Sequence, residues 1–174
     1  MGGEIFIHRA AVLGAGVMGS QIAALLANAG VDVDLLDLPT ADGPTELAKQ
    51  GIERALRARP AAFFSPESAA RVTPGTLDDL SCLNEVDWVI EAVVENMLAK
   101  QELLARVEGA VSETAVISTN TSGLPIGAMA AASSPSFRHR FLGIHFFNPP
   151  RHMKLVEVVP GPDTGPETVE AMRS

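Results

Sequence analysis

The stretch Arg9-Ala10-Ala11-Val12-Leu13-Gly14-Ala15-Gly16-Val17-Met18-Gly19 carries the strongest fold signal in this chain. A short apolar run leads into the pattern Gly-x-Gly-x-x-Gly, and an alanine- and leucine-rich segment over 17–29 follows, stopping at Gly30. A second apolar run, 31–36, ends at Asp37. The pattern predicts a dinucleotide-binding βαβ unit: a strand, a glycine-rich turn, a helix, and a second strand that ends at an acidic residue.

Each residue of the glycine-rich turn has an expected task. Gly14 allows the tight turn, Gly16 lets the backbone approach a pyrophosphate, and Gly19 lets the helix pack closely on the strand. Val17 and Met18 open the helix, whose N-terminal amides and positive dipole end favour phosphate groups. We therefore predict that this turn binds the phosphates of the cofactor.

Asp37 is expected to bind the adenosine ribose hydroxyls. A carboxylate repels a 2′-phosphate, and Leu38 and Pro39 offer no compensating base, so NAD is predicted in preference to NADP. The alternative is that Asp37 is an ordinary loop carboxylate that caps the segment after it.

Strand-like and helix-like patterns alternate along the rest of the chain. Strands are predicted at 72–73, 88–92 and 115–118, and helices at 45–59, from 65–67 onward and at 98–111. In the last helix Leu103, Leu104 and Val107 are expected to face inward, with Lys100, Glu102 and Arg106 outward. The alternation predicts an α/β fold with a doubly wound, mainly parallel, Rossmann-like sheet.

Two further strands are expected at 141–147 and 154–159, joined by a turn that is rich in proline. If the turn of this antiparallel hairpin centres near Arg151, His145 faces Glu157 with Cβ atoms about 4.5–5.5 Å apart, so the carboxylate can orient the imidazole. A one-residue slip would place them on opposite faces. The alternative is a hydrogen-bonded structural histidine beside a solvated Glu157.

Polar residues gather where the predicted strands end, which is where parallel sheets bind ligands. These residues are Glu95, Asn96, Asn120, Ser122, His145 and Asn148. One of them alone could serve a turn, and Asn120 is expected to do so in part. Their convergence with a cofactor motif favours a catalytic site.

Length and composition narrow the class of protein. The net charge of −8 argues against a nucleic-acid partner, and no apolar run reaches membrane-spanning length. The single Cys82 excludes an intrachain disulfide and favours a reducing compartment, most simply the cytoplasm. We assign no metal site. Residues 1–160 are predicted to form one domain, and 161–174 a linker with the start of a helix near Glu167.

The sequence resembles the NAD-binding domain of the 3-hydroxyacyl-CoA dehydrogenases over nearly its whole length. The motifs that carry the resemblance are the glycine-rich run 12–19, Glu91-Ala92-Val93-Val94-Glu95-Asn96 with Lys100, Ser118-Thr119-Asn120-Thr121-Ser122, and His145-Phe146-Phe147-Asn148-Pro149 with Glu157. They occur in the family's order, which makes the resemblance specific. It implies oxidation of a 3-hydroxyacyl-CoA thioester, with NAD as the hydride acceptor, in fatty-acid β-oxidation.

The resemblance also implies residue roles. His145 would take the proton of the 3-hydroxyl, Glu157 would hold and polarise His145, and Ser122 would hydrogen-bond the substrate oxygen. Glu95, Lys100 and Asn148 would help to seat the nicotinamide half of NAD.

Some features of the sequence depart from the family pattern. Family members continue into a helical second domain that closes over the acyl chain and usually forms a dimer, so a homo-oligomer is expected only through a part absent here. Ala55 stands where some members use a serine near coenzyme A, and the bases of the 45–59 helix either meet CoA phosphates or form a solvated face. These bases are Lys49, Arg54, Arg57 and Arg59. Segments 36–39 and 63–66 resemble the long bifunctional forms that also carry an enoyl-CoA hydratase.

Two other functions stay open at this stage. One is a related β-hydroxyacid or sugar-acid dehydrogenase, although such enzymes typically place a lysine base on a helix of the second domain. The other is a non-catalytic NAD-binding module.

Overall fold

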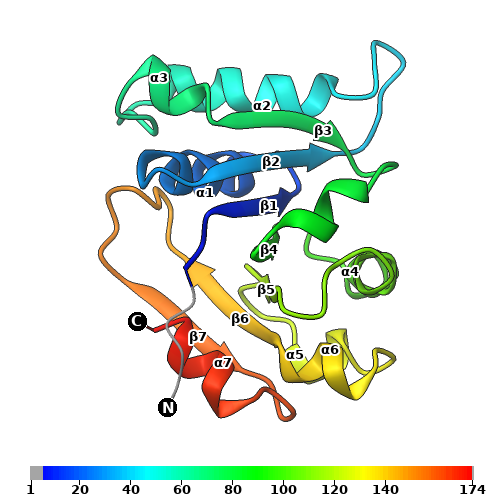
Figure 1. Cartoon of the computed structure of the whole chain (residues 1–174). Helices are drawn as coiled ribbons and strands as arrows, with labels where there is room; N and C mark the ends of the chain where they lie inside the picture. Colours follow the sequence, from blue (N-terminus) through cyan, green and yellow to red (C-terminus); the bar gives the residue numbers. More distant parts are fainter. Residues whose placement is uncertain (1–5, 174) are drawn as a thin grey trace.

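A seven-stranded sheet with the order β3-β2-β1-β4-β5-β6-β7 forms the centre of the molecule in the computed structural model (Figure 1). The strands are β1 (Arg9–Leu13), β2 (Asp32–Asp37), β3 (Val72–Thr76), β4 (Trp88–Glu91), β5 (Val116–Thr119), β6 (Phe141–Phe146) and β7 (Val156–Pro160). Neighbouring strands pair in parallel except β6 and β7, which are antiparallel. This topology confirms the predicted doubly wound, mainly parallel sheet with a C-terminal antiparallel hairpin.

The structure describes residues 6–173. Residues 1–5 of the predicted first domain and Ser174 at the end of the predicted tail therefore lie outside the described residues.

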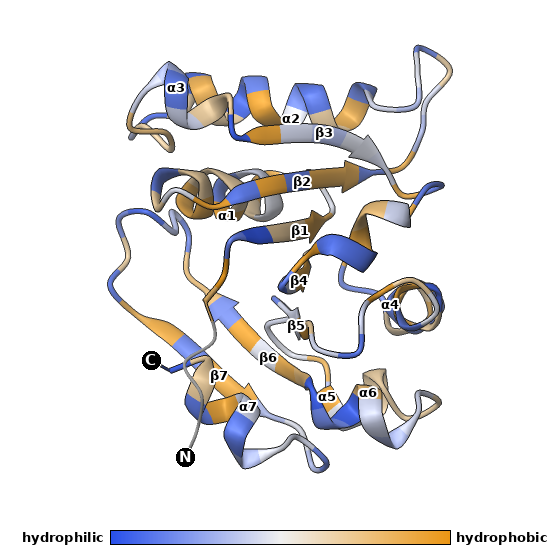
Figure 2. Cartoon of the chain, in the orientation of Figure 1, coloured by the Kyte–Doolittle hydropathy of each residue, from blue (hydrophilic) through white to orange (hydrophobic). Residues whose placement is uncertain are grey.

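Helices cover both faces of the sheet. They are α1 (Val17–Asn28), α2 (Glu46–Arg57), α3 (Pro66–Ala69), η1 (Ser81–Glu85), α4 (Met97–Glu108), α5 (Ile126–Met129), α6 (Pro135–His139) and α7 (Pro166–Ala171). Ala10 and Val12 pack with α1 and α2 in one core, whereas Ala11 and Leu13 pack with α4, α5 and α6 in the other. Figure 2 shows the hydrophobic central strands between helices with many hydrophilic residues.

Local signals explain where several helices begin. Ser65, Asn96 and Ser134 each accept a hydrogen bond from a backbone N–H three residues later, at 3.4, 3.0 and 3.3 Å. Pro66 and Pro135 follow two of these caps, in the first turn where a missing N–H costs nothing. The predicted cap and proline at 65–66 therefore do start a helix.

Some element boundaries differ from the prediction. Strand β3 runs to Thr76 rather than ending at residue 73, because it pairs with β2 through Pro74 and Gly75 at the sheet edge, where a proline is tolerated. The connection 147–155 between β6 and β7 is longer than expected. Arg151 ties that connection to the 59–64 segment through Ala61 O at 2.8 Å. The short helices η1, α5 and α6 were not predicted.

The segment after β7 packs against the sheet. Thr164 Oγ1 donates to Phe141 O at 2.6 Å, while Gly165 N and Thr168 Oγ1 donate to His139 O at 2.8 and 3.1 Å. Helix α7 begins at Pro166, one residue before the predicted start. The domain boundary at residue 160 stays a prediction. Residues 164–168 are hydrogen-bonded to β6 and to the end of α6.

One row of paired residues lies at the carboxyl ends of the parallel strands. Leu13 of β1 pairs with Glu91 of β4, Glu91 with Thr119 of β5, and Thr119 with Gly143 of β6. The glycine-rich turn, Glu95 and Ser122 follow this row in the segments after β1, β4 and β5, and His145 follows it within β6. The fold therefore brings the predicted site residues together at the carboxyl ends of the parallel strands.

Candidate functional site

The glycine-rich turn has the close contacts that its sequence predicts. Gly14 has φ of +103°, and a Cβ there would lie 2.6 Å from Ala92 O. A Cβ on Gly19 would lie 1.8 Å from Gly14 O, so this glycine allows α1 to touch the end of β1. At Gly16 a Cβ would meet nothing within 4 Å. The turn thus leaves open space beside the N-terminus of α1, where helix amides favour phosphate.

Asp37, at the end of β2, braces this turn. Its Oδ2 accepts a hydrogen bond from Ala15 N at 2.6 Å, and its Oδ1 accepts one from Leu38 N at 2.7 Å. The second contact is the local capping that was considered as an alternative role. Asp37 nevertheless also borders the cavity beside the glycines, so capping does not exclude contact with a ribose.

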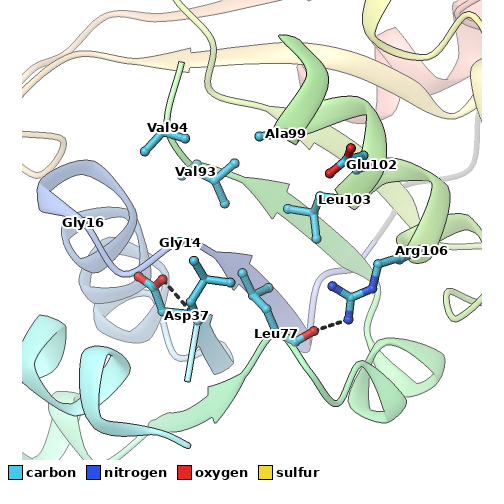
Figure 3. Close-up of a pocket in the computed structure, with 12 residues that line it drawn as sticks. Gly14, Gly16, Asp37, Leu77, Val93, Val94, Ala99, Glu102, Leu103 and Arg106 are labelled. Carbon is cyan, nitrogen blue, oxygen red and sulfur yellow. Dashed lines mark hydrogen bonds between the residues drawn. The ribbon is translucent and has the colours of Figure 1, made fainter. Parts of the chain in front are cut away.

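A cavity of about 380 Å³ lies beside the glycine-rich turn (Figure 3). Its lining residues are Gly14, Gly16, Asp37, Leu38, Leu77, Ala92, Val93, Val94, Ala99, Glu102, Leu103 and Arg106. Arg106 donates a hydrogen bond to Leu77 O, which ties α4 to the segment after β3. Mainly apolar walls with a few charged groups, here Asp37, Glu102 and Arg106, are typical of small-molecule sites, and this cavity suits the adenosine half of a dinucleotide.

His145 and Glu157 pair directly across β6 and β7, so the register is the predicted one. Glu157 Oε2 lies 2.9 Å from His145 Nδ1, and Ser122 Oγ lies 3.2 Å from His145 Nε2. Because a carboxylate accepts from Nδ1–H, the neutral ring presents Nε2 as an acceptor toward Ser122. A cavity of about 250 Å³ is bordered by all three residues.

Glu95 organises the loop that carries Ser122. Its Oε1 accepts hydrogen bonds from the Thr121 hydroxyl, from Ser122 N at 3.1 Å and from Gly123 N at 3.3 Å. Partial burial opposes the charge of Glu95, but these hydrogen bonds and the nearby Lys100 outweigh it and hold the pKa of Glu95 below its ordinary value. The carboxylate therefore stays ionised at neutral pH.

Lys100 is buried, which contradicts its predicted place on the outer face of the helix. Only 1% of its surface is exposed, because it lies one turn before Leu104 and two before Val107 on the inward face of α4. Glu91, which is fully buried, compensates the charge: Lys100 Nζ lies 2.7 and 2.9 Å from its two oxygens. Lys100 also lies 3.4 Å from Glu95 Oε2.

Residues 9–174 match the family described as "3-hydroxyacyl-CoA dehydrogenase, NAD binding domain". The chain belongs to this family. It is 51% identical over 167 residues to a probable 3-hydroxyacyl-CoA dehydrogenase of Deinococcus radiodurans, with 94% of this chain and 48% of the relative covered. The chain thus spans about half the length of this curated relative.

Solved structures of the family share the fold. The crystal structure of FadB2 from M. tuberculosis matches with a TM-score of 0.80 at 35% identity, covering 96% of this chain and 59% of that one. The 3-hydroxybutyryl-CoA dehydrogenase from Escherichia coli K12 matches with a TM-score of 0.79 at 32% identity, covering 95% and 35%. The cofactor of this NAD-binding domain is accordingly NAD.

Other polar residues at the strand ends of the NAD-binding domain have separate tasks. Asn148 Oδ1 lies 3.4 Å from Gln21 Nε2 of α1, which links the connection after β6 to the cofactor helix. Asn120 Oδ1 accepts from Phe146 N at 2.9 Å, in agreement with a structural role. Asn96 caps α4. Val17 is exposed at the start of α1, whereas Met18 is half-buried and packs against the core.

The basic residues of α2 are only partly free to meet a ligand. Arg54 Nη2 donates to Ala15 O at 3.2 Å, and Arg57 pairs with Glu53 at 3.2 Å. Ala55 is 1% exposed and belongs to the core, so this position does not reach the surface. Contact with CoA phosphates stays a prediction for this helix.

The sequence did not indicate a role in the site for Glu91. It also did not indicate that residues of α4 line the cavity beside the glycine-rich turn. A carboxylate at the end of an otherwise apolar strand was the available signal for Glu91, because such a group needs a buried partner. In the described part of the chain, no helix has the length and apolar character needed to cross a bilayer.

Proposed function

We propose that this chain is the NAD-binding part of an enzyme that oxidises 3-hydroxyacyl-CoA to 3-oxoacyl-CoA in fatty-acid β-oxidation. The arrangement of Ser122, His145 and Glu157 carries this proposal, since Ser122 Oγ and Glu157 Oε2 lie 3.2 and 2.9 Å from the two ring nitrogens of His145. Removing an alcohol proton at neutral pH needs a base of this kind near the cofactor.

His145 is proposed as the general base. With Nδ1–H directed at Glu157, the lone pair of Nε2 is available to take the proton of the substrate's 3-hydroxyl. Glu157 then stabilises the imidazolium that forms, because the opposite charge lies within hydrogen-bond distance. A general base of this type contributes roughly 10²–10⁴-fold to the rate.

Ser122 is proposed to position the substrate oxygen. Its hydroxyl already occupies the place beside Nε2 from which the proton would be taken, and it can turn to donate to the substrate oxygen. The order of contacts Glu157–His145–Ser122 therefore directs the reacting oxygen toward the base.

The residues that would hold NAD divide between its two halves. Gly14, Gly16 and Gly19 with the first residues of α1, Val17 and Met18, would hold the pyrophosphate, and Asp37 the adenosine ribose. Glu95, Lys100 and Asn148 would border the nicotinamide half. When bound, NAD supplies the acceptor for the hydride that leaves C3 of the substrate. The open space at Gly16 and the cavity beside Asp37 support this fit.

The remaining parts of the proposal concern the whole protein. A second domain would grip the acyl-CoA thioester and could form a homo-oligomer, while Lys49, Arg54, Arg57 and Arg59 of the α2 region are candidates for CoA phosphates. The single Cys82 supports a cytoplasmic protein. Burial raises the pKa of its thiol to about 11, so the thiol stays protonated at neutral pH.

The test measures NADH formation by the full-length protein with a 3-hydroxyacyl-CoA. We expect turnover that His145→Ala reduces by at least about 10²-fold with little change in NAD affinity. His152→Ala is the matched control, since His152 is exposed and its ring Nε2 lies 3.2 Å from the carbonyl oxygen of Ala61, away from Ser122 and Glu157. NAD binding without oxidation would favour a non-catalytic module, and oxidation of free hydroxyacids but not thioesters would favour the other dehydrogenase class.

A further inference from the structure

We infer that Glu91 is a positioning residue for the proposed reaction. It would act through Thr119 on one side and through Lys100 and Glu95 on the other, and so set the position of Ser122 against His145. The inference rests on the proposed function, and it concerns a carboxylate that the preceding assignment leaves without a role.

Glu91 is the buried centre of a polar network at the end of β4. Its Oε1 accepts from Val93 N at 2.7 Å, and its Oε2 accepts from Thr119 Oγ1 at 2.6 Å. Lys100 Nζ lies 2.7 and 2.9 Å from the two oxygens and also donates to Val93 O at 3.3 Å. Both charges are buried, but hydrogen bonds satisfy the carboxylate on every side.

A buried ion pair is a costly way to fill space. Removing two charges from water offsets much of their attraction, and apolar residues of similar volume often stabilise a protein as well or better. The Glu91–Lys100 pair is therefore poorly explained by stability alone. What distinguishes it from an apolar pair is that its charges and hydrogen bonds reach two neighbouring segments.

The first connection runs along the sheet. The Thr119 hydroxyl donates to Glu91, which fixes its position. The same Oγ1 accepts a hydrogen bond from Thr121 N at 3.2 Å. Thr121 is the residue directly before Ser122. Glu91 thus fixes the start of the loop that carries Ser122.

The second connection runs through the lysine. Lys100 lies 3.4 Å from Glu95 Oε2, and Glu95 Oε1 accepts from Ser122 N and Gly123 N. Glu91 and Glu95 therefore share one ammonium group. If Glu91 lost its charge, Lys100 would pair with Glu95 alone and draw it away from the loop. The charge of Glu91 thereby keeps Glu95 free to hold the backbone of Ser122.

Both connections end at the same contact, Ser122 Oγ at 3.2 Å from His145 Nε2. Glu91 touches neither residue, so its effect is on geometry. A displacement of about 1 Å in a reacting group can reduce a rate by about 10²-fold. A loss of this size is the expected consequence of removing the charge of Glu91.

The experiment compares Glu91→Gln with Asp34→Asn in the full-length protein. Asp34 is a matched control because it is also a buried carboxylate on the sheet, paired with Arg9 Nε at 2.9 Å, but it belongs to β2 and has no contact with the loop. With NAD saturating, we expect Glu91→Gln to lower kcat by about 10- to 10²-fold, and Asp34→Asn to leave kcat unchanged. An unchanged kcat in Glu91→Gln, or an equal loss in both variants, would overturn the inference.

A second measurement does not depend on turnover. Nitrogen NMR of the histidine rings, without substrate, should show a shifted Nε2 signal for His145 in Glu91→Gln and an unchanged signal for His139. If wild type does not oxidise 3-hydroxyacyl-CoA, the proposed function fails and this signal alone decides the inference. Should Glu91→Gln not fold, Thr119→Val removes the sheet connection and should shift the same signal. An unmoved His145 signal contradicts the inference.

Discussion

At the scale of single residues, His145 receives its orientation from two neighbours on different elements. Glu157 on β7 fixes Nδ1 as the donor, and Ser122 after β5 lies beside Nε2. The side chain of His145 is 20% exposed. A substrate can therefore approach the ring while Glu157 keeps the ring in its orientation. In the proposed reaction the carboxylate would therefore act through His145, without touching the reacting atoms.

Replacing Glu157 by glutamine tests this division of work. The amide oxygen still accepts from Nδ1–H, but no negative charge remains to stabilise the imidazolium. We expect kcat of the full-length protein to fall by about 10-fold or more, which is less than for His145→Ala. Steady-state kinetics with saturating NAD measures it. Glu170→Gln on α7 is the control, and a Glu157→Gln enzyme with wild-type kcat would remove Glu157 from the mechanism.

Asp37 permits a second prediction at this scale, on the choice of cofactor. Asp37→Asn keeps an acceptor for Ala15 N but loses the charge that favours ribose hydroxyls and repels a 2′-phosphate. Hydrogen bonds to charged groups contribute about 1.5–3 kcal/mol, so NAD affinity should fall by at least about 10-fold. NADP affinity should fall less or rise. Calorimetric titration with both cofactors checks this, and equal binding of the two by wild type would contradict the role of Asp37.

At the scale of elements, the contact between β1 and α1 depends on glycines with unlike surroundings. A Cβ on Gly19 would overlap Gly14 O, while one on Gly16 would meet nothing within 4 Å. Gly19→Ala should therefore lower the free energy of unfolding by about 1–3 kcal/mol, as overpacking does.

Gly16→Ala is the matched variant for the same contact. Its methyl group would enter the space left for the pyrophosphate, so NAD affinity should fall while the free energy of unfolding changes by less than about 0.5 kcal/mol. Denaturant titration and calorimetry separate the two effects. Equal destabilisation by both variants would show that the turn does not hold the helix in the way described.

The loop 121–123 gives a prediction on pH. Glu95 has a pKa below its ordinary value of 4.5 in the folded protein, so its stabilising contribution is present above that value and is lost as the pH falls through the lower, folded pKa. Glu95→Gln should therefore reduce the acid sensitivity of unfolding in this range. Denaturation at a series of pH values measures it, with Glu170→Gln as control. If the free energy of unfolding of Glu95→Gln fell with decreasing pH as steeply as that of wild type, Glu95 would not stabilise the loop through these hydrogen bonds.

The sequence predicts elements well where a local pattern sets them. Two apolar runs and a proline-rich turn centred near Arg151 were enough to pair His145 with Glu157, and the glycine spacing was enough to place the turn before α1. The inward direction of Lys100 was not predictable from its charge, because only the fold places Glu91 beside it. Likewise, no spacing along the chain indicates that Glu95 holds the backbone of Ser122; that contact depends on how β4 and β5 pair.

At the scale of the whole molecule, apolar side chains remain exposed near the two cavities. On the α4 side these are Val94 and Leu98, and on the β7 side Leu155, Val156 and Val159. Exposed apolar groups beside a site favour contact with a further partner or ligand. The chain spans 48% of its Deinococcus relative; we propose that these side chains contact a further part of the full-length protein.

Residues 1–174 contain the glycine-rich turn and the proposed base, but only part of the length of the curated relative. We expect this chain to bind NAD, because the glycine-rich turn, Asp37 and the adjoining cavity lie within it, yet to oxidise 3-hydroxyacyl-CoA poorly or not at all. His145, with Ser122 and Glu157, would be present, but a second domain that excludes water and grips the thioester would not. Substrate positioning alone is worth about 10²-fold or more.

A longer chain that continues past Ser174 should restore turnover. His145→Ala in that chain should then abolish it at nearly unchanged NAD affinity. Parallel measurements of NAD binding and NADH formation on both chains test the prediction. Full turnover by residues 1–174 would mean that the base and its two neighbours need no covering domain, and a longer chain that tolerates the loss of His145 would place the base elsewhere.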